Sequence, residues 1–173
     1  MILPIYTYGQ PVLKKKGVPV EPAYPFLDEL IDNMWETMYA ARGVGLAAPQ
    51  IGQSLQLFII DTIQIMKEGE EEIISESGDE WSYEEGCLSI PDLRGDVDRK
   101  PNITITYQDA SFNTYKEHFD GVNARVIQHE YDHIIGQLFT EKLKPIKRAL
   151  LKRKLEQMKK GKVKADYKLK RIG

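Results

Sequence analysis

The sequence has little cysteine and no long apolar run, and each scarcity excludes a class of protein. One cysteine in 173 residues cannot form an intrachain disulfide, which excludes a disulfide-stapled secreted domain. No run reaches the roughly 18 apolar residues that a membrane helix needs. The first residues also lack the basic and apolar regions of a secretory signal. We therefore expect a cytoplasmic protein with no membrane partner.

The overall composition predicts one globular domain. The chain is 42% hydrophobic and 29% charged, which is ordinary for a folded protein, so we expect a single catalytic domain over residues 1–173. The net charge of −2 hides a segregation, because residues 142–173 hold fourteen Lys or Arg and two acids, a charge of +12. The basic C-terminal tail, residues 161–173, belongs to this segment. Such segregation indicates an anionic partner, and the alternative is a solvated helix face with a frayed tail.

The first half of the chain predicts one helix and one buried strand. Apolar residues at helical spacing over residues 27–38 predict an amphipathic helix. Residues 43–52, with three glycines and a proline, predict a loop, and residues 55–61 predict a buried strand. Residues 67–85 hold nine acids and one lysine, and we interpret most of them as a mobile surface excursion or a hairpin tip.

The second half predicts a hairpin followed by two helices. Residues 103–107 alternate as a half-buried strand does, and residues 114–119 predict its return strand. A largely apolar helix is expected between Asp120 and Gly136, then a strand, and then a last helix over residues 145–160. This order indicates an α+β fold, with mostly antiparallel strands around a buried central helix and a C-terminal helix.

The central helix carries the strongest chemical signal. His129 and His133 are four residues apart, so they share one helix face and can bind one metal ion. Glu130 is offset by one residue, which places it beside the ion as an acid/base rather than as a ligand. The alternative is two core histidines on a shared face. That alternative is weakened because burying so many polar groups without a site is costly.

The third ligand is predicted from what the chain lacks. Downstream of His133 there is no histidine, and the acids there, among them Glu141, form no motif. Cys87 is the only thiol, and a thiolate is a strong ligand for a borderline-soft divalent ion. Without the histidine pair it would be interpreted as a small buried hydrophobe. Three protein ligands leave one position open, which is typical of a catalytic site and indicates hydrolysis of a polarised carbonyl.

Other residues are candidates for holding the reacting group and the substrate. An oxyanion needs donors, which the Gln50 side-chain amide and the Leu88 backbone N–H could supply. Val122 and Val126 share the helix face of His129 and could line a side-chain pocket. The alternatives are an ordinary loop amide for Gln50 and plain core for the two valines.

Three further features have weaker interpretations. Asp132 is expected to orient a ligand imidazole or to pair with an arginine such as Arg99. His118, on a strand without a sequence partner, is interpreted as a surface residue. The glycine pattern that begins at Gly43 resembles a dinucleotide fingerprint, but it follows a helix and leads to a strand, which is the reverse of that motif's context.

Three segments together closely resemble peptide deformylase: GVGLAAPQ at 43–50, EGCLS at 85–89 and HEYDH at 129–133. They occur in that family's order, and the resemblance covers nearly the whole chain, from Ile5 to about Lys160. It implies hydrolytic removal of the formyl group from the N-formylmethionine end of new polypeptides. It also implies one divalent metal, with Fe²⁺ expected and Zn²⁺ or Ni²⁺ able to occupy the same ligands.

The resemblance assigns roles position by position. It implies that the metal ligands are Cys87, His129 and His133 and that the acid/base is Glu130. It implies that Gln50 and Leu88 are the oxyanion donors. It also implies that the backbone at Val44–Gly45 and Glu85–Gly86 pairs with the substrate. Arg94 sits where the family often carries an arginine near the substrate cleft. The acidic stretch is longer than in compact members, and residues 162–173 match no motif. For an enzyme of nascent chains, the basic end suggests contact with ribosomal RNA, and no DNA partner is expected.

Two other classes fit part of the pattern. A zincin-like peptidase shares the helix motif but needs a downstream ligand such as Glu141. A noncatalytic binding module with a structural metal needs a fourth protein ligand and would not depend on Glu130. Replacing Cys87 or Glu130 separates both from a deformylase.

Overall fold

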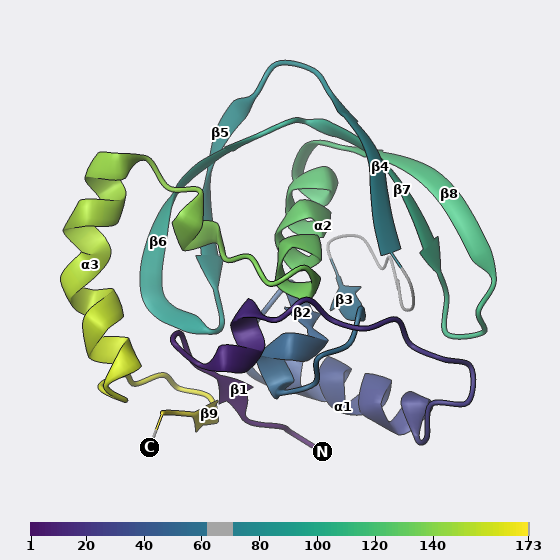
Figure 1. The fold of residues 1–173 in the computed structure, drawn as a ribbon, viewed down its shortest axis with the longest axis horizontal. Helices are drawn as coiled ribbons and strands as arrows, with labels where there is room; N and C mark the ends of the chain where they lie inside the picture. Colours follow the sequence, from purple (N-terminus) through teal and green to yellow (C-terminus); the bar gives the residue numbers. More distant parts are fainter. Residues whose placement is uncertain (62–70, 173) are drawn as a thin grey trace.

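The computed structural model describes residues 1–61 and 71–172 and has the expected α+β fold (Figure 1). Three helices are present in this part of the chain: α1 (Leu27–Ala40), α2 (Gly121–Ile134) and α3 (Pro145–Lys159). The strands are β1 (Ile5–Tyr6), β2 (Gly45–Ala47), β3 (Phe58–Ile60), β4 (Glu71–Ser77), β5 (Trp81–Cys87), β6 (Ile90–Arg99), β7 (Asn102–Gln108), β8 (Thr114–Asp120) and β9 (Leu169–Lys170). Short 3-10 turns lie at Pro11–Lys14, Ala48–Ile51 and Phe139–Glu141.

The strands surround the central helix, as expected. The β5–β6 hairpin, the β4–β7–β8 sheet and the β2–β3 pair are antiparallel, whereas β1 and β9 pair in parallel. In Figure 1, α2 stands between the β5–β6 hairpin and the β4–β7–β8 sheet. Its apolar side is fully buried, with Ala124 and Ile127 at 0% exposure and Ile134 at 1%. Burial on several sides fixes the helix that carries the histidines.

Local chemistry explains where α2 begins and ends. Asp120 precedes it with an extended backbone, although its side chain makes no capping hydrogen bond. Gly136 follows it with φ of +79°, and a Cβ there would lie 2.7 Å from the Lys14 carbonyl oxygen. Only glycine suits both the left-handed backbone and this close approach.

Three expectations were wrong. Residues 43–52 are not simply a loop, because Gly45–Ala47 form β2 and Ala48–Ile51 form a 3-10 turn. The acidic stretch is not an excursion: its residues from 71 onwards form β4 and β5, which pair with β7 and β6. Glu76 and Glu84 are exposed, whereas Ile73 packs against the core and Glu85 is buried, so the acids lie on paired strands and not on a projecting loop. Residues 67–70 lie outside the described residues. The strand expected between α2 and α3 is a 3-10 turn, which Glu141 closes by accepting the Leu138 N–H at 2.8 Å.

The C-terminal tail packs against the body of the protein instead of fraying. Val163 is buried at 8% exposure among core residues, and Leu169–Lys170 pair with Ile5–Tyr6. The Ile5 N–H donates to the Lys168 carbonyl at 2.9 Å. In the described part of the chain, every helix is too short or too polar to cross a bilayer.

Candidate metal centre

The motif on α2 brings two imidazoles and a thiol together. Ligand atoms of Cys87, His129 and His133 all lie within 4.8 Å of one another. Cys87 ends β5, and its Sγ lies 3.3 Å from Nε2 of His133. Two imidazole nitrogens and one sulfur suit borderline-soft divalent ions such as Fe²⁺, Zn²⁺ and Ni²⁺, so the residues present fit the expected metal.

The two histidines are in different electrostatic surroundings. Burial, and then the neighbouring His129, hold the pKa of His133 well below its usual value, so His133 is neutral and available as a ligand. Burial also lowers the pKa of His129, but hydrogen bonds with Cys87 and Glu85 outweigh it and raise the pKa well above its usual value. His129 can bind a cation only in its neutral form, because a protonated imidazole has no free nitrogen lone pair.

Glu130 is buried beside the cluster with an unused oxygen. Its exposure is 4%, and its Oε2 has no hydrogen-bond partner within residues 1–61 and 71–172. Burial raises the pKa of Glu130 to about 7, against the opposing effect of His129. A carboxyl group with this pKa can both accept and donate a proton near neutral pH.

Gly45 makes room for Glu130. A Cβ at this position would lie 2.8 Å from both Cγ and Cδ of Glu130, closer than real side chains pack. Any other residue would therefore displace the carboxylate, or the strand β2 that carries Gly45. The glycine at position 45 therefore lets the β2 backbone lie directly against the Glu130 side chain.

Gln50 points its amide at the thiol. Its Oε1 accepts the Ala47 N–H at 2.9 Å, which fixes the orientation of the amide. Its Nε2 then lies 3.4 Å from Cys87 Sγ and 3.4 Å from Ser89 Oγ. At 2% exposure this is a held donor rather than an ordinary loop amide.

A buried ion network stands behind His129. Glu85 Oε2 lies 2.9 Å from Nδ1 of His129, which leaves Nε2 for the metal cluster. Arg99 donates to both oxygens of Glu85 at 2.7 and 3.0 Å, and to Asp132 at 2.8 Å. Arg125 donates to Glu85 at 3.0 Å. The expected pairing of Asp132 with Arg99 is confirmed, whereas Glu85 is the residue that orients a histidine.

An open cleft of about 710 Å³ leads to the cluster. The structure brings the sequence-predicted residues together, because all of them except the fully buried His133 line this cleft: Val44, Gly45, Gln50, Glu85, Gly86, Cys87, Leu88, Arg94, Val122, Val126, His129 and Glu130. His118 lies on β8 with its side chain exposed, as predicted.

Sequence reasoning missed three side chains. The Glu85 carboxylate contacts His129, whereas the sequence had predicted a role only for the Glu85 backbone. Arg125 is 2% exposed and lies one helical turn before His129, and a charged residue in an apolar helix was the signal for it. Tyr167 also lines the cleft, and no sequence motif marks it.

Proteins with this fold and a cluster of this kind beside a buried carboxyl group belong to the class of metal-dependent hydrolases. A family model described as Polypeptide deformylase matches residues 2–149. The chain belongs to the peptide deformylase family, which removes the formyl group from the N-terminus of newly made polypeptides.

Relatives and solved structures agree with this assignment. The chain is 49% identical to a peptide deformylase of Christiangramia forsetii, with 98% of this chain and 95% of that protein covered. It is 48% identical to one of Flavobacterium johnsoniae, over 98% and 96% of the two chains. The crystal structure of peptide deformylase from Thermus thermophilus superposes with a TM-score of 0.86 at 37% identity, covering 93% of this chain and 99% of that one.

Proposed function

We propose that Cys87, His129 and His133 hold the divalent metal and that Glu130 is the acid/base of deformylation. The observation that carries this assignment is the convergence of the three ligand atoms within 4.8 Å, beside a buried carboxyl group with an unused oxygen. When bound, the metal supplies Lewis-acid activation of water and of the formyl carbonyl. The reaction consumes one water and releases formate and the free amine.

The chain's own residues account for the proton transfers and the charge. Glu130 takes a proton from the attacking water and delivers it to the leaving nitrogen, which its pKa of about 7 permits. The Gln50 amide and the Leu88 N–H donate to the oxyanion that develops on the formyl oxygen. Gln50 is already oriented for this role by Ala47.

We propose the substrate contacts from the residues that line the cleft. Backbone at Val44–Gly45 and Glu85–Gly86 pairs with the extended peptide, as a strand edge does. Val122 and Val126 lie on the helix face of His129 and line the pocket for the methionine side chain. Arg94, at the rim, lies beside the following residues of the substrate.

The proposal is tested with purified full-length protein on formyl-Met-Ala and acetyl-Met-Ala. We expect rapid release of formate, slow release of acetate, and loss of bound metal and activity in Cys87→Ser. Acetate release at a comparable rate, or a Cys87→Ser variant that keeps both metal and activity, would overturn it. The second result would favour a peptidase-like site with a downstream ligand.

The metal itself is proposed to be Fe²⁺, with Zn²⁺ and Ni²⁺ able to occupy the same ligands. The donor set of two nitrogens and one sulfur supports all three, and the family resemblance favours iron. Anaerobic purification with metal analysis tests this: formate release should scale with iron content. A zinc-only preparation of equal activity per metal would contradict it.

We also propose that the basic end contacts ribosomal RNA in the cytoplasm and that residues 1–173 form one catalytic domain. The charge of +12 on residues 142–173 supports the contact, and the β1–β9 pairing supports one domain.

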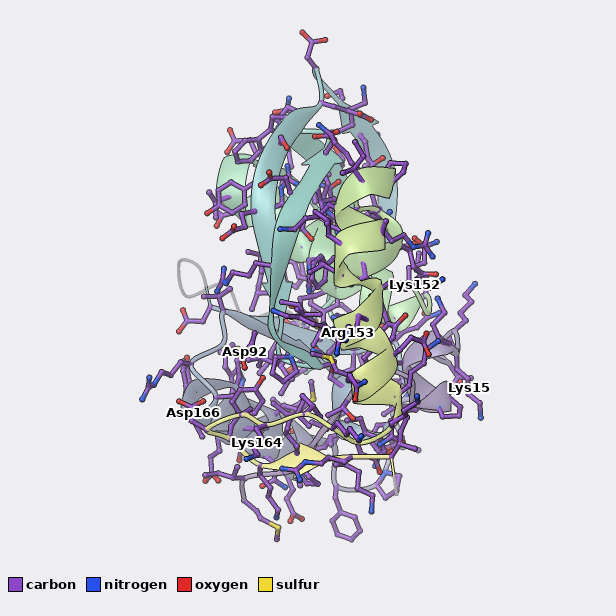
Figure 2. All side chains as sticks on the ribbon, turned by 90° about the vertical axis from the view of Figure 1, so that its left-hand side faces the viewer. Lys15, Asp92, Lys152, Arg153, Lys164 and Asp166 are labelled. Atoms are coloured by element: carbon purple, nitrogen blue, oxygen red, sulfur yellow. The ribbon has the colours of Figure 1, made fainter. Side chains whose placement is uncertain are left out.

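Lys152 and Arg153 lie exposed on α3 (Figure 2), so their reversal to Glu should weaken ribosome binding and its salt dependence. Lys116→Glu on β8 is the control. Equal binding by all three proteins would refute the contact.

A further inference from the structure

The C-terminal segment, residues 163–170, crosses the protein beside the cleft and is held at both ends. Val163 is buried near the end of α3, and Lys170 accepts hydrogen bonds from the Thr7 N–H at 3.2 Å and the Gln10 Nε2 at 2.8 Å. Between these anchors, exposed Asp166 lies 3.8 Å from Arg42, which precedes the Gly43 loop. Figure 2 shows Asp166 on this segment below Asp92 of β6. The segment is therefore fixed across the cleft edge.

Tyr167 reaches from this segment to the turn that carries the metal-binding thiol. Its hydroxyl donates to the Leu88 carbonyl at 2.7 Å, across 79 positions of sequence. Burial raises the pKa of the Tyr167 hydroxyl above its usual value, so the hydroxyl stays protonated and remains a donor at neutral pH. Tyr167 also lines the cleft, together with Cys87 and Leu88.

The turn between β5 and β6 is gripped from two sides. Cys87 pairs directly with Ile90, which leaves Leu88 and Ser89 to form a tight reversal. The Ser89 carbonyl accepts the Tyr8 N–H at 2.9 Å, while the Leu88 carbonyl accepts the Tyr167 hydroxyl. The Tyr167 hydroxyl holds the peptide plane that follows Leu88, and the pairing of Cys87 with Ile90 holds the residue that precedes it. The Leu88 N–H therefore lies between two restrained points of the backbone.

We propose that Tyr167 is a positioning residue for deformylation, which fixes the Leu88 N–H as an oxyanion donor through the Leu88 carbonyl. This inference rests on the proposed function, because it needs Leu88 to serve that role. Tyr167 lies outside the matched residues 2–149, in a segment that no motif of the sequence singled out. A donor aimed at developing charge acts on the transition state, so loosening it lowers kcat more than it raises KM.

The test is Tyr167→Phe in the full-length, metal-loaded protein, which removes one hydroxyl and keeps the ring. We expect kcat on formyl-Met-Ala to fall by about tenfold with KM nearly unchanged, since a slightly misplaced donor loses part of its effect. Amide hydrogen exchange in residues 87–90 should become faster, while the rest of the protein stays as protected. Tyr167→Ala, which also removes the cleft wall, should raise KM as well.

Tyr107→Phe is the matched control, because its hydroxyl donates to Glu117 at 2.8 Å on the β7–β8 hairpin, away from the cleft. It should change neither kcat nor exchange in residues 87–90. An unchanged kcat in Tyr167→Phe, or a loss equal to that of Tyr107→Phe, would overturn the inference. Wild-type protein without deformylase activity would instead refute the proposed function, so the two failures are distinguishable.

Discussion

Helices α2 and α3 are nearly equal in length and use charge in opposite ways. On α2, Arg125, Glu130 and Asp132 are buried at 2%, 4% and 6% exposure. On α3 the charges face solvent, and even the apolar Ile146 and Leu150 are 80% and 73% exposed. A charge that is buried needs a partner or a chemical role, whereas a solvated charge needs neither.

The comparison separates two uses of polar residues. Around α2, the buried ion pairs of the described residues lead towards His129, through Glu85 or through Asp132 and Arg99. On α3, one side packs on the core, through Leu155 and Met158. Substitutions on α2 should therefore change chemistry or folding, and substitutions on the outer face of α3 should change neither.

The largest expected effect is the loss of the acid/base. Glu130→Gln should lower kcat on formyl-Met-Ala by about 10²–10⁴-fold, because an amide cannot take the proton from water and pass it on. Metal content should stay at the wild-type level, because the proposed ligands are Cys87, His129 and His133. Glu156→Gln on α3, an exposed residue, is the control and should leave kcat unaltered. Activity of Glu130→Gln within threefold of wild type would remove the acid/base role.

The next effect concerns stability. Arg125→Met should lower the free energy of unfolding by about 3–5 kcal/mol, because it removes a buried charge partner of Glu85 and leaves the Val97 and Trp81 carbonyls without their donor. Urea denaturation measures the change. Lys152→Met on α3 also replaces a basic residue by Met, but at an exposed site. Its free energy of unfolding should stay within about 0.5 kcal/mol of the wild-type value. Equal losses in the two variants would erase the contrast between the helices.

A smaller effect is expected from one methyl group. Gly45→Ala places a Cβ against the Glu130 carboxyl group and should cost about 1–3 kcal/mol of stability, with a reduced kcat. Thermal denaturation and steady-state kinetics measure the two losses. Gly86→Ala is a useful comparison, because its Cβ would meet only the flexible Arg94 side chain at 3.3 Å. If Gly45→Ala behaved as Gly86→Ala does, the close approach would be unimportant.

The smallest effect is expected on the outer face of α3. Replacing Ile146 and Leu150 together by Ser should change the free energy of unfolding by no more than about 0.5–1 kcal/mol, because both are already solvated. Differential scanning calorimetry of the purified protein measures it. A large destabilisation would mean that Ile146 and Leu150 are covered in solution. The outer face of α3 would then be buried, as α2 is, and the contrast between the two helices would be lost.

The parts of the site that were predictable from sequence are those encoded locally. His129 and His133 lie four residues apart on one helix, so their spacing alone predicted their shared face and placed Glu130 beside it. Cys87 was predicted because the helix lacked a third ligand, which is a chemical rather than a spatial argument. The fold class followed from the order of periodic segments, since strand alternation and helical stripes are local patterns.

The parts that were not predictable depend on contacts between distant segments. The role of the Glu85 side chain requires β5, β6 and α2 to meet, and no spacing along the chain encodes that meeting. The acidic residues of β4 and β5 suggested a solvated excursion, because composition does not show that strands β6 and β7 supply backbone partners. The contact of Tyr167 with Leu88 belongs to the same group.

The pairing of β1 with β9 also has a consequence for how the protein is made. Synthesis proceeds from the N-terminus, so Ile5 and Tyr6 are made well before their pairing partners Leu169 and Lys170. The carbonyl of Leu88 likewise receives the Tyr167 hydroxyl only after the C-terminal segment has emerged from the ribosome. The cleft of a growing chain therefore lacks one of its lining side chains until the segment that carries Tyr167 has been made.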